Sequence, residues 1–249
     1  MRTRALGSLA ALAAIALLVV ACSDDDDQTL VPPPDDSHLT LVVNVTIDGE
    51  SLAMGTPYDA IGETTMQFNR VSFYLSGFGF ENQAGETAYP TGVDAFLFNG
   101  ASTAPAALPG IERDPYTTLH LKAGLPPEVN HADPLQAVFP LDEPSMHWNW
   151  NPDLGYIFAR IEGMYDSSGD GQIGLDDDEF QYHCASSELL RSFTVDLEDV
   201  VLGDTLRLDV DLRQLLGGLD VPAEPIAHGD VESTVKIMNN FFRAVDVGQ

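Results

Sequence analysis

Apolar and polar residues alternate from residue 38 onward. The first such run carries apolar side chains at every second position and ends at Asp48-Gly49. Its apolar members are Leu39, Leu41, Val43, Val45 and Ile47. A period of two places one face of an extended segment against a core, and Asp-Gly is typical of a turn. The pattern therefore predicts a half-buried strand.

Similar runs recur along the chain, separated by Gly, Pro and Asp. They cover 66–80, 93–98, 116–123, 156–162, 180–183, 190–197 and 205–212. Parallel βαβ units would need amphipathic helices between strands, and no such helices are evident here. The predicted fold class is therefore all-β: an antiparallel β-sandwich or barrel of about eight or nine strands.

The C-terminus has a different period. Ser233 is a candidate cap for a run with apolar residues near one helical face. These residues are Val235, Met238, Phe241, Phe242 and Val245. A short C-terminal helix packed on the sheets is predicted, and an edge strand is the alternative.

The N-terminus reads as a targeting segment. Arg2 and Arg4 precede an apolar run, and Val19-Val20-Ala21-Cys22 resembles a lipobox. Residues 1–21 are predicted to be a lipoprotein signal peptide, which leaves Cys22 as the lipidation site. An ordinary signal peptide or a membrane span is the alternative. Residues 22–37, with four consecutive Asp and three consecutive Pro, are predicted to be a tether, and 38–249 the folded domain.

Charge limits the possible partners. Lys and Arg number 11 against 39 Asp and Glu, and loss of Arg2 and Arg4 brings the charge from −28 to near −30. Such a field repels nucleic acid and anionic lipid, so no nucleic-acid partner is expected. Solubility alone also explains the acidity. The predicted location is extracytoplasmic, with lipid anchoring at the outer membrane or cell surface favoured by Ser23 after Cys22.

Residues 166–177 match the twelve-residue calcium loop. Oxygen ligands are expected from Asp166, Ser168, Asp170, the carbonyl of Gln172 and Asp177. Gly171 occupies the position of the sharp turn. An Asp at the last position, where Glu is usual, and strand-like flanks depart from the common pattern. A solvated acidic turn is the alternative.

Both tryptophans, Trp148 and Trp150, lie close to His147. Packing at the end of a sandwich would explain the pair. Imidazoles beside an aromatic wall would instead suit a transition metal, with His131 and His183 as further ligands. Without other information, each histidine is more often an ordinary surface or core residue.

Several segments together resemble the MbnP-like copper-binding family over about residues 38–215. They are Phe73-Tyr74-Leu75-Ser76-Gly77-Phe78, Asn130-His131, Met146-His147-Trp148-Asn149-Trp150, Gly155-Tyr156-Ile157-Phe158 and Phe180-Gln181-Tyr182-His183. The family resemblance implies a bacterial extracytoplasmic all-β protein that binds copper through histidines. It also implies a possible partner, a di-haem MauG-like peroxidase, which in some members oxidises a tryptophan near the metal to kynurenine.

Carried over to this chain, the resemblance assigns His131 and His183 as copper ligands and Trp148 or Trp150 as the candidate oxidation site. His147 is a possible third ligand. Val45 or Thr46 stands where many relatives have a first-strand histidine. His147, His120 or Cys184 is a possible replacement ligand.

Cys184 is the only cysteine apart from Cys22. Burial as a small hydrophobe is the ordinary outcome for a single thiol, and Cu(I) binding is the functional alternative.

Catalytic machinery is not evident. The chain contains no G-x-S-x-G, H-E-x-x-H or G-x-x-x-x-G-K motif. The predicted function is copper capture or handover by a non-enzymatic lipoprotein, with a structural calcium loop. The rival is a calcium-stabilised adhesion or ligand-binding module without copper.

Overall fold

The structure, a computed structural model, describes residues 39–248 except for 62, 94, 101–104, 113–114, 149–150 and 198–203. The described residues belong to one compact unit, 36–249. The signal peptide, Cys22, the tether and Trp150 lie outside the described residues. Within those residues, no helix has both the length and the apolar character needed to cross a membrane.

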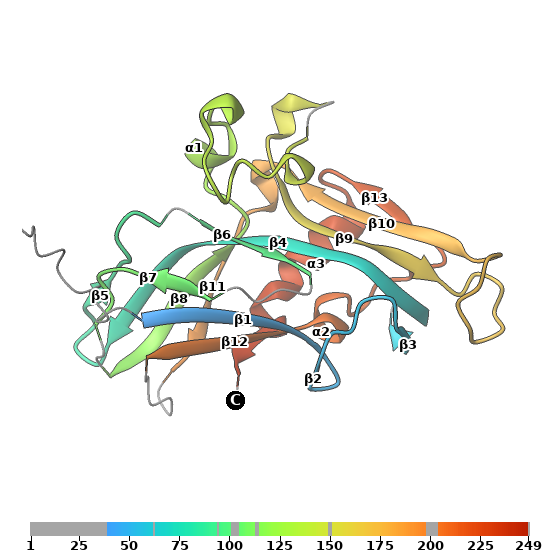
Figure 1. Cartoon of the computed structure of the whole chain (residues 1–249), viewed down its shortest axis with the longest axis horizontal. Helices are drawn as coiled ribbons and strands as arrows, with labels where there is room; N and C mark the ends of the chain where they lie inside the picture. Colours follow the sequence, from blue (N-terminus) through green and yellow to red (C-terminus); the bar gives the residue numbers. More distant parts are fainter. Residues whose placement is uncertain are drawn as a thin grey trace, which may run out of the picture. The chain divides into compact units, whose positions relative to one another are not determined.

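Strands dominate the described chain and form two sheets (Figure 1). The strands are β1 (Leu39–Ile47), β2 (Glu50–Ser51), β3 (Pro57–Ile61), β4 (Thr64–Asn82), β5 (Thr87–Ala88), β6 (Ala95–Asn99), β7 (Ala106–Leu108), β8 (Tyr116–Ala123), β9 (Ile157–Tyr165), β10 (Asp178–Ala185), β11 (Arg191–Asp196), β12 (Thr205–Asp211), β13 (Ile226–His228) and β14 (Val245–Val247). The helices are α1 (Pro127–Asn130), α2 (Leu212–Leu215) and α3 (Glu232–Ala244), with 3₁₀ turns η1 (Pro134–Gln136), η2 (Pro144–Met146), η3 (Pro152–Leu154) and η4 (Ser187–Leu189).

The larger sheet is organised around β4, which runs through 19 residues. β4 pairs along its length with β3, β5, β6, β8 and β9, and the path continues through β10 to β13. Its register shifts between Ser76 and Gly79, where β4 passes β8. Such a bulge adds a residue to one strand and bends it. One long, bent strand thus holds together a sheet that curls into a half-barrel.

Two strand pairs are parallel. β1 runs parallel to β12 in the smaller sheet, and β10 runs parallel to β13 in the larger one. The mostly-β sandwich is confirmed, but a wholly antiparallel arrangement is wrong. Parallel neighbours need a long crossover rather than a hairpin, and each of these pairs joins strands that are distant in sequence. The strands beyond the eight or nine predicted are mostly two or three residues long.

The C-terminal helix is confirmed as α3, and it packs on the sheets through Phe241. The ring of Phe241 meets Phe73 of β4 edge-on at 5.5 Å between centroids. Phe242 points to solvent with 64% of its surface exposed, and Val245 already belongs to β14. The buried face is therefore narrower than the sequence pattern suggested.

The start of α3 also differs from the prediction. Val231, not Ser233, occupies the cap position. The hydroxyl of Thr234 accepts a hydrogen bond from the backbone N–H of Val231 at 3.0 Å. Ser233 instead donates to the carboxylate of Glu224.

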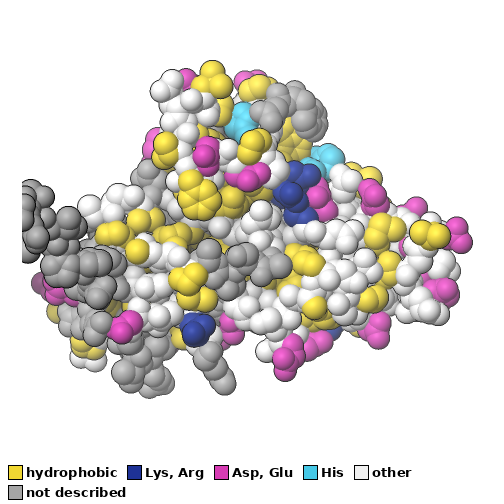
Figure 2. Space-filling view, viewed as in Figure 1, with side chains coloured by type: hydrophobic (Ala, Val, Ile, Leu, Met, Phe, Trp, Pro, Cys, Tyr) yellow, Lys and Arg dark blue, Asp and Glu magenta, His cyan; other side chains and the backbone are white. Residues whose placement is uncertain are grey.

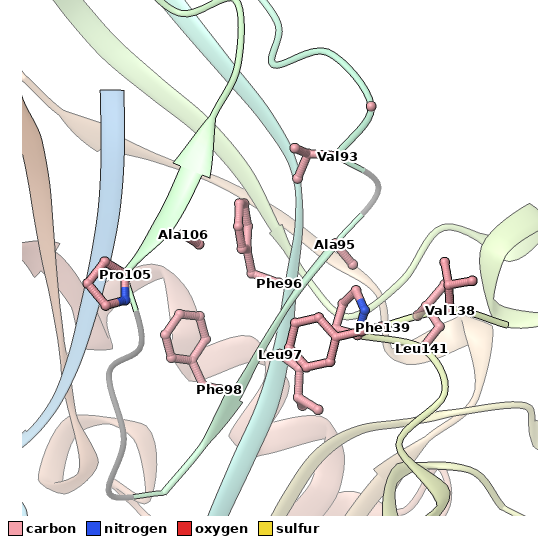
Figure 3. Close-up of a pocket in the computed structure, with 12 residues that line it drawn as sticks. Val93, Ala95, Phe96, Leu97, Phe98, Pro105, Ala106, Val138, Phe139 and Leu141 are labelled. Atoms are coloured by element: carbon pink, nitrogen blue, oxygen red, sulfur yellow. The ribbon is translucent and has the colours of Figure 1, made fainter. Parts of the chain in front are cut away.

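An apolar hollow of about 310 Å³ opens beside β6 (Figure 3). All twelve of its lining residues are glycine, proline or apolar. Phe96 and Phe98 line one side and Phe139 another. Phe139 is 77% exposed, which makes the rim of this hollow an exposed apolar surface.

Candidate metal centre

Two histidines face each other at the edge of the larger sheet. β10 and β13 run parallel in a register that pairs His183 with His228. The backbone N–H of Gly229 donates to the carbonyl of His183 at 2.9 Å, which extends the ladder past the pair. The two imidazole rings stack with centroids 4.5 Å apart and planes 8° from parallel. Sheet register therefore brings two imidazole rings together.

Trp148 packs against the edges of both rings. Its ring centroid lies 5.9 Å from that of His183 and 5.7 Å from that of His228, at steep angles. The backbone N–H of Trp148 donates to the carbonyl of Gly155 at 2.9 Å. Only 2% of the tryptophan is exposed. The indole thus forms a wall beside the two stacked imidazole rings.

Glu162 of β9 anchors His183. Its Oε1 lies 2.6 Å from His183 Nε2 and 2.7 Å from Arg160 Nε. Desolvation alone would raise the pKa of Glu162, but hydrogen bonds from His183 and Arg160 and their charges lower it to about 2. The carboxylate is therefore ionised and accepts both bonds. A neutral His183 consequently carries its proton on Nε2 and its lone pair on Nδ1.

Two arginine side chains offset the negative charge of Glu162. Arg70 Nε lies 3.8 Å from Oε2 of Glu162, and Arg160 also donates to the carbonyl of Ser145 at 2.7 Å. Acidic groups are scattered over the face shown in Figure 2, where one basic group lies beside a histidine. The ionised Glu162 is thus held between two guanidinium groups and an imidazole.

His228 has a buried ring nitrogen without a protein partner. Among the described residues, its Nε2 makes no hydrogen bond although it is shielded from solvent. Desolvation, followed by the neighbouring His183, lowers the pKa of His228. The ring is therefore neutral at physiological pH. Buried polar atoms in proteins are nearly always paired, so this nitrogen calls for a specific explanation.

His131 lies near the end of β10 but is not stacked with the pair. Its Nε2 is 2.9 Å from Ser187 Oγ in η4, and the ring is exposed. The neighbouring Asn130 is buried, and it donates to Ser187 and to the carbonyl of Leu154. Asn130 also accepts the backbone N–H of Tyr156 at 2.8 Å. The Asn130-His131 pair thus ties α1 to η4 and to the segment at 154–156.

His147 sits in the segment that leads into Trp148. It forms a β-bridge with Tyr156, and its ring meets that of Tyr156 edge-on at 5.1 Å. No group of three or more His, Cys, Asp or Glu side chains is arranged to hold a metal ion within the described ranges. The structure thus brings His183 together with His228, and not with the predicted His131 and His147.

Cys184 faces away from the histidines. Successive strand residues point to opposite sides, so Cys184 enters the core while His183 lies on the outer face. The thiol is fully buried, and burial raises its pKa. Sγ lies 3.9 Å from the carbonyl of Thr234. This placement agrees with the ordinary interpretation of a buried small hydrophobe and does not join Cys184 to the imidazole pair.

Comparisons with known proteins agree with this architecture. The MbnP family model matches residues 36–234, which is more than half of the chain. The chain belongs to the MbnP family. A solved structure, MbnP from Methylosinus trichosporium, superposes with a TM-score of 0.50 at 17% identity, covering 78% of this chain and 81% of that one. At this identity the likeness supports the fold alone. No curated protein matches the sequence.

The predicted calcium loop of this MbnP-family protein connects β9 to β10 as a hairpin. Asp166 Oδ1 accepts the N–H of Gly169 at 2.6 Å, and its Oδ2 accepts that of Gly171 at 2.7 Å. Asp177 accepts the N–H groups of Ser168 and Gly174. Desolvation opposes the shift at Asp166, yet these N–H groups lower its pKa, and the bond from Gly174 lowers that of Asp177. Both carboxylates therefore stay ionised, and the backbone N–H groups of the loop turn inward to bind them.

Sequence reasoning missed His228, the partner of His183. The residue lies in β13, which has only three residues, and one-residue alternation is not visible over so short a stretch. Its pairing with β10 is parallel and non-local. The only sequence signal was the Ala-His-Gly step at 227–229, which is too common to single out.

Proposed function

We propose that this protein is a lipid-anchored, extracytoplasmic copper-binding protein that captures or hands over the metal without catalysing a reaction. The observation that carries the proposal is the stacked pair of His183 and His228, in which His228 presents a buried, neutral Nε2 that has no hydrogen-bond partner among the residues the structure describes. A neutral imidazole nitrogen is the commonest metal ligand in proteins.

The residues present fit copper. Imidazole suits Cu, Zn, Fe and Ni, so the donor set alone does not select one of them. The family resemblance described above favours copper among these metals. A lone pair on an imidazole nitrogen binds a cation and not an anion. Glu162 adds no net negative charge here, because Arg70 and Arg160 lie beside its carboxylate.

Glu162 would position His183 for the metal. Metal-binding histidines usually donate their other ring N–H to a carboxylate, which fixes the tautomer and the ring orientation. The Glu162–His183 bond has this form, and Arg160 and Arg70 keep the carboxylate ionised. His183 would thus offer Nδ1 to the ion while Glu162 holds Nε2.

Trp148 is the residue proposed for oxidation. It contacts both imidazole rings edge-on, so it lies directly against the proposed ligands. The family resemblance suggests a di-haem peroxidase as the external oxidant. Kynurenine would form when the indole takes up two oxygen atoms and then loses one carbon as formate by hydrolysis, so an intact mass about 4 Da above that expected would indicate this conversion.

Calcium binding by the β9–β10 loop is part of the same proposal. Asp166, Ser168, Asp170, Gln172 and Asp177 fit the ligand positions of the twelve-residue pattern, and Gly171 has the positive φ of 81° that a sharp turn needs. The loop lies at the far end of the β9–β10 hairpin from His183. Its role would be to hold the hairpin that carries Glu162 and His183.

The lipid anchor is proposed at Cys22. Replacing Cys22 with Ala should move the protein from the membrane fraction to the soluble extracytoplasmic fraction, while the unaltered chain stays with the outer membrane. Recovery of the Cys22→Ala variant in the membrane fraction would refute a lipid anchor at this residue.

The copper proposal is tested by competition titration of the mature domain with Cu⁺ under reducing conditions. His183→Ala and His228→Ala should each weaken binding at least tenfold. Gln181→Ala is the matched control, because Gln181 lies on the same face of β10 two residues before His183. Equal affinity in all four proteins would refute the site.

A further inference from the structure

A second hollow, of about 550 Å³, lies on the outer face of the larger sheet, away from the histidine pair. Three strands build it in register. Lys122 of β8 faces Ser192 of β11, and His120 of β8 faces Thr194 of β11. All four side chains point outward, because the residues between them are buried in the core. The hollow therefore presents polar groups in a regular grid.

Gly77 lines this hollow, and Gly79 lies next to it under Tyr89. Gly77 and Gly79 lie at the bulge where β4 passes β8. A Cβ on Gly77 would come within 3.0 Å of Lys122 Cδ, and Gly77 has a φ of +62° that favours glycine. A Cβ on Gly79 would come within 3.0 Å of the ring of Tyr89. Because the two glycines have no side chains, Lys122 can lie against Gly77 and Tyr89 against Gly79 at the border of the hollow.

A carboxylate and an imidazole meet in the hollow. Glu81 Oε2 lies 2.8 Å from His120 Nε2, and both side chains are partly exposed. Together they supply acceptors and donors side by side. The negative charge of Glu81 is offset by the ammonium group of Lys122, which lines the same hollow. The site is therefore close to electrically neutral, in a protein that carries a net charge of −28.

Tyr89 adds an aromatic surface. It follows β5, and 66% of its surface is exposed. Its ring stands over Gly79 beside the Glu81–His120 pair. An exposed aromatic ring next to clustered hydrogen-bonding groups suits a ligand with one apolar face and several hydroxyls.

We propose that this hollow binds a neutral carbohydrate. The ring of Tyr89 would pack against the apolar face of a sugar ring, and Glu81, His120, Lys122 and the hydroxyls of Ser192 and Thr194 would bind its hydroxyl groups. Charge balance favours a neutral ligand over an anion or a cation.

The shape of the hollow indicates the form of the ligand. The polar lining side chains are partly or fully exposed and belong to an open sheet face, so one side of the ligand remains in solvent. Such a surface suits a sugar unit within a longer glycan better than a fully enclosed small metabolite. The hollow shares no residue with the histidine pair, so a carbohydrate can bind in the hollow whether or not copper binds at the histidines.

The test uses the mature protein with maltotriose, cellotriose and chitotriose as probes, observed by saturation-transfer NMR and quantified by titration. At least one probe should bind saturably. Tyr89→Ala and Glu81→Gln should each weaken that binding about tenfold, since each removes a contact or a charge-assisted hydrogen bond. Phe242→Ala is the matched control, because Phe242 is a similarly exposed aromatic residue on α3.

Three outcomes would overturn the proposal. The first is the absence of saturable binding for all three probes. The second is binding that survives both Tyr89→Ala and Glu81→Gln in proteins whose melting temperatures match the unaltered chain. A hyaluronan oligosaccharide of similar length serves as the charged probe, and tighter binding of it than of the neutral sugars would also contradict the proposal.

Discussion

His183 and His228 stack face to face with ring centroids 4.5 Å apart, because β10 and β13 run parallel in a register that places the two residues opposite each other. The ring of Trp148 contacts both imidazole rings edge-on. The site therefore depends on backbone positions in three segments, and small backbone changes near Trp148 should disturb it.

A substitution at Gly155 tests whether the site depends on the backbone near Trp148. Its φ is +73°, and a Cβ there would lie 2.4 Å from the carbonyl oxygen of Asn130. Gly155→Ala should therefore lower the free energy of unfolding by about 3 kcal/mol or more, since a strained φ and a backbone clash add. Because Gly155 accepts the N–H of Trp148, copper affinity should fall as well. Urea unfolding and copper titration measure the two effects.

Gly85 is the matched control. Its φ is +79°, but a Cβ there would meet nothing within 4 Å. Gly85→Ala should cost only about 1 kcal/mol, from the backbone conformation alone, and should leave copper affinity unchanged. Equal costs at both positions would show that the contact with Asn130 does not exist.

Ser186 holds strain directly after β10. Its φ of 138° and ψ of 142° fall in a region that essentially only glycine occupies. Ser186→Gly should raise the free energy of unfolding by about 1 kcal/mol, despite loss of the hydroxyl that accepts the N–H of Glu188. Ser186→Ala keeps the strain and loses the hydroxyl, so it should destabilise. Two variants that shift stability in the same direction would contradict this account.

Calcium should stabilise the β9–β10 hairpin. Adding millimolar Ca²⁺ to chelator-treated protein should raise the melting temperature, because the ion binds the folded loop and not the unfolded chain. Asp166→Asn should abolish the rise. Asp176→Asn, which changes an exposed acidic residue of the same loop outside the predicted ligand set, should keep it. A rise of equal size in both variants would exclude the loop as the calcium site.

Tyr74 should make the folded domain less stable at alkaline pH. Burial, with smaller contributions from Tyr156, Glu143 and Asp142, raises the pKa of Tyr74, whose hydroxyl donates to the carbonyl of Pro140 at 3.1 Å. The unfolded chain ionises this tyrosine near pH 10, whereas the folded chain does not. Its contribution to stability is therefore complete below pH 10 and is lost as pH rises further.

Unfolding in urea at pH 8 and pH 11 measures this effect. The unaltered protein should lose more stability between the two pH values than Tyr74→Phe, by about 1 kcal/mol. At pH 8 the variant should be weaker by about 1 kcal/mol, from the lost hydrogen bond. Identical pH dependence in both proteins would mean that Tyr74 is accessible to solvent.

The long strands could be predicted because their alternation extends over many residues. The run that starts at Leu39 and the run at Tyr116–Ala123 match β1 and β8 at both ends. β13 could not be predicted, since three residues carry no period and the pairing with β10 is set by packing in three dimensions. For the same reason, His228 in β13 could not be identified from the sequence.

The candidate site shows a related limit. His183 was identified from its strand, and Trp148 from its neighbours, but the ligand partner came from a distant segment. Cys184 is next to His183 in sequence and yet faces the opposite side of β10, because strand side chains alternate. Adjacency in sequence made Cys184 an alternative ligand beside His183, but the sheet places the two side chains on opposite faces.

Copper content of the mature protein, exported to the extracytoplasmic space and purified without chelator or metal-affinity tag, tests the central claim most directly. Element-resolved analysis should find about one copper per chain in the unaltered protein and in Gln181→Ala, and almost none in His228→Ala. A chain without copper, even after Cu⁺ is offered under reducing conditions, or full copper in His228→Ala, would contradict the histidine-pair site.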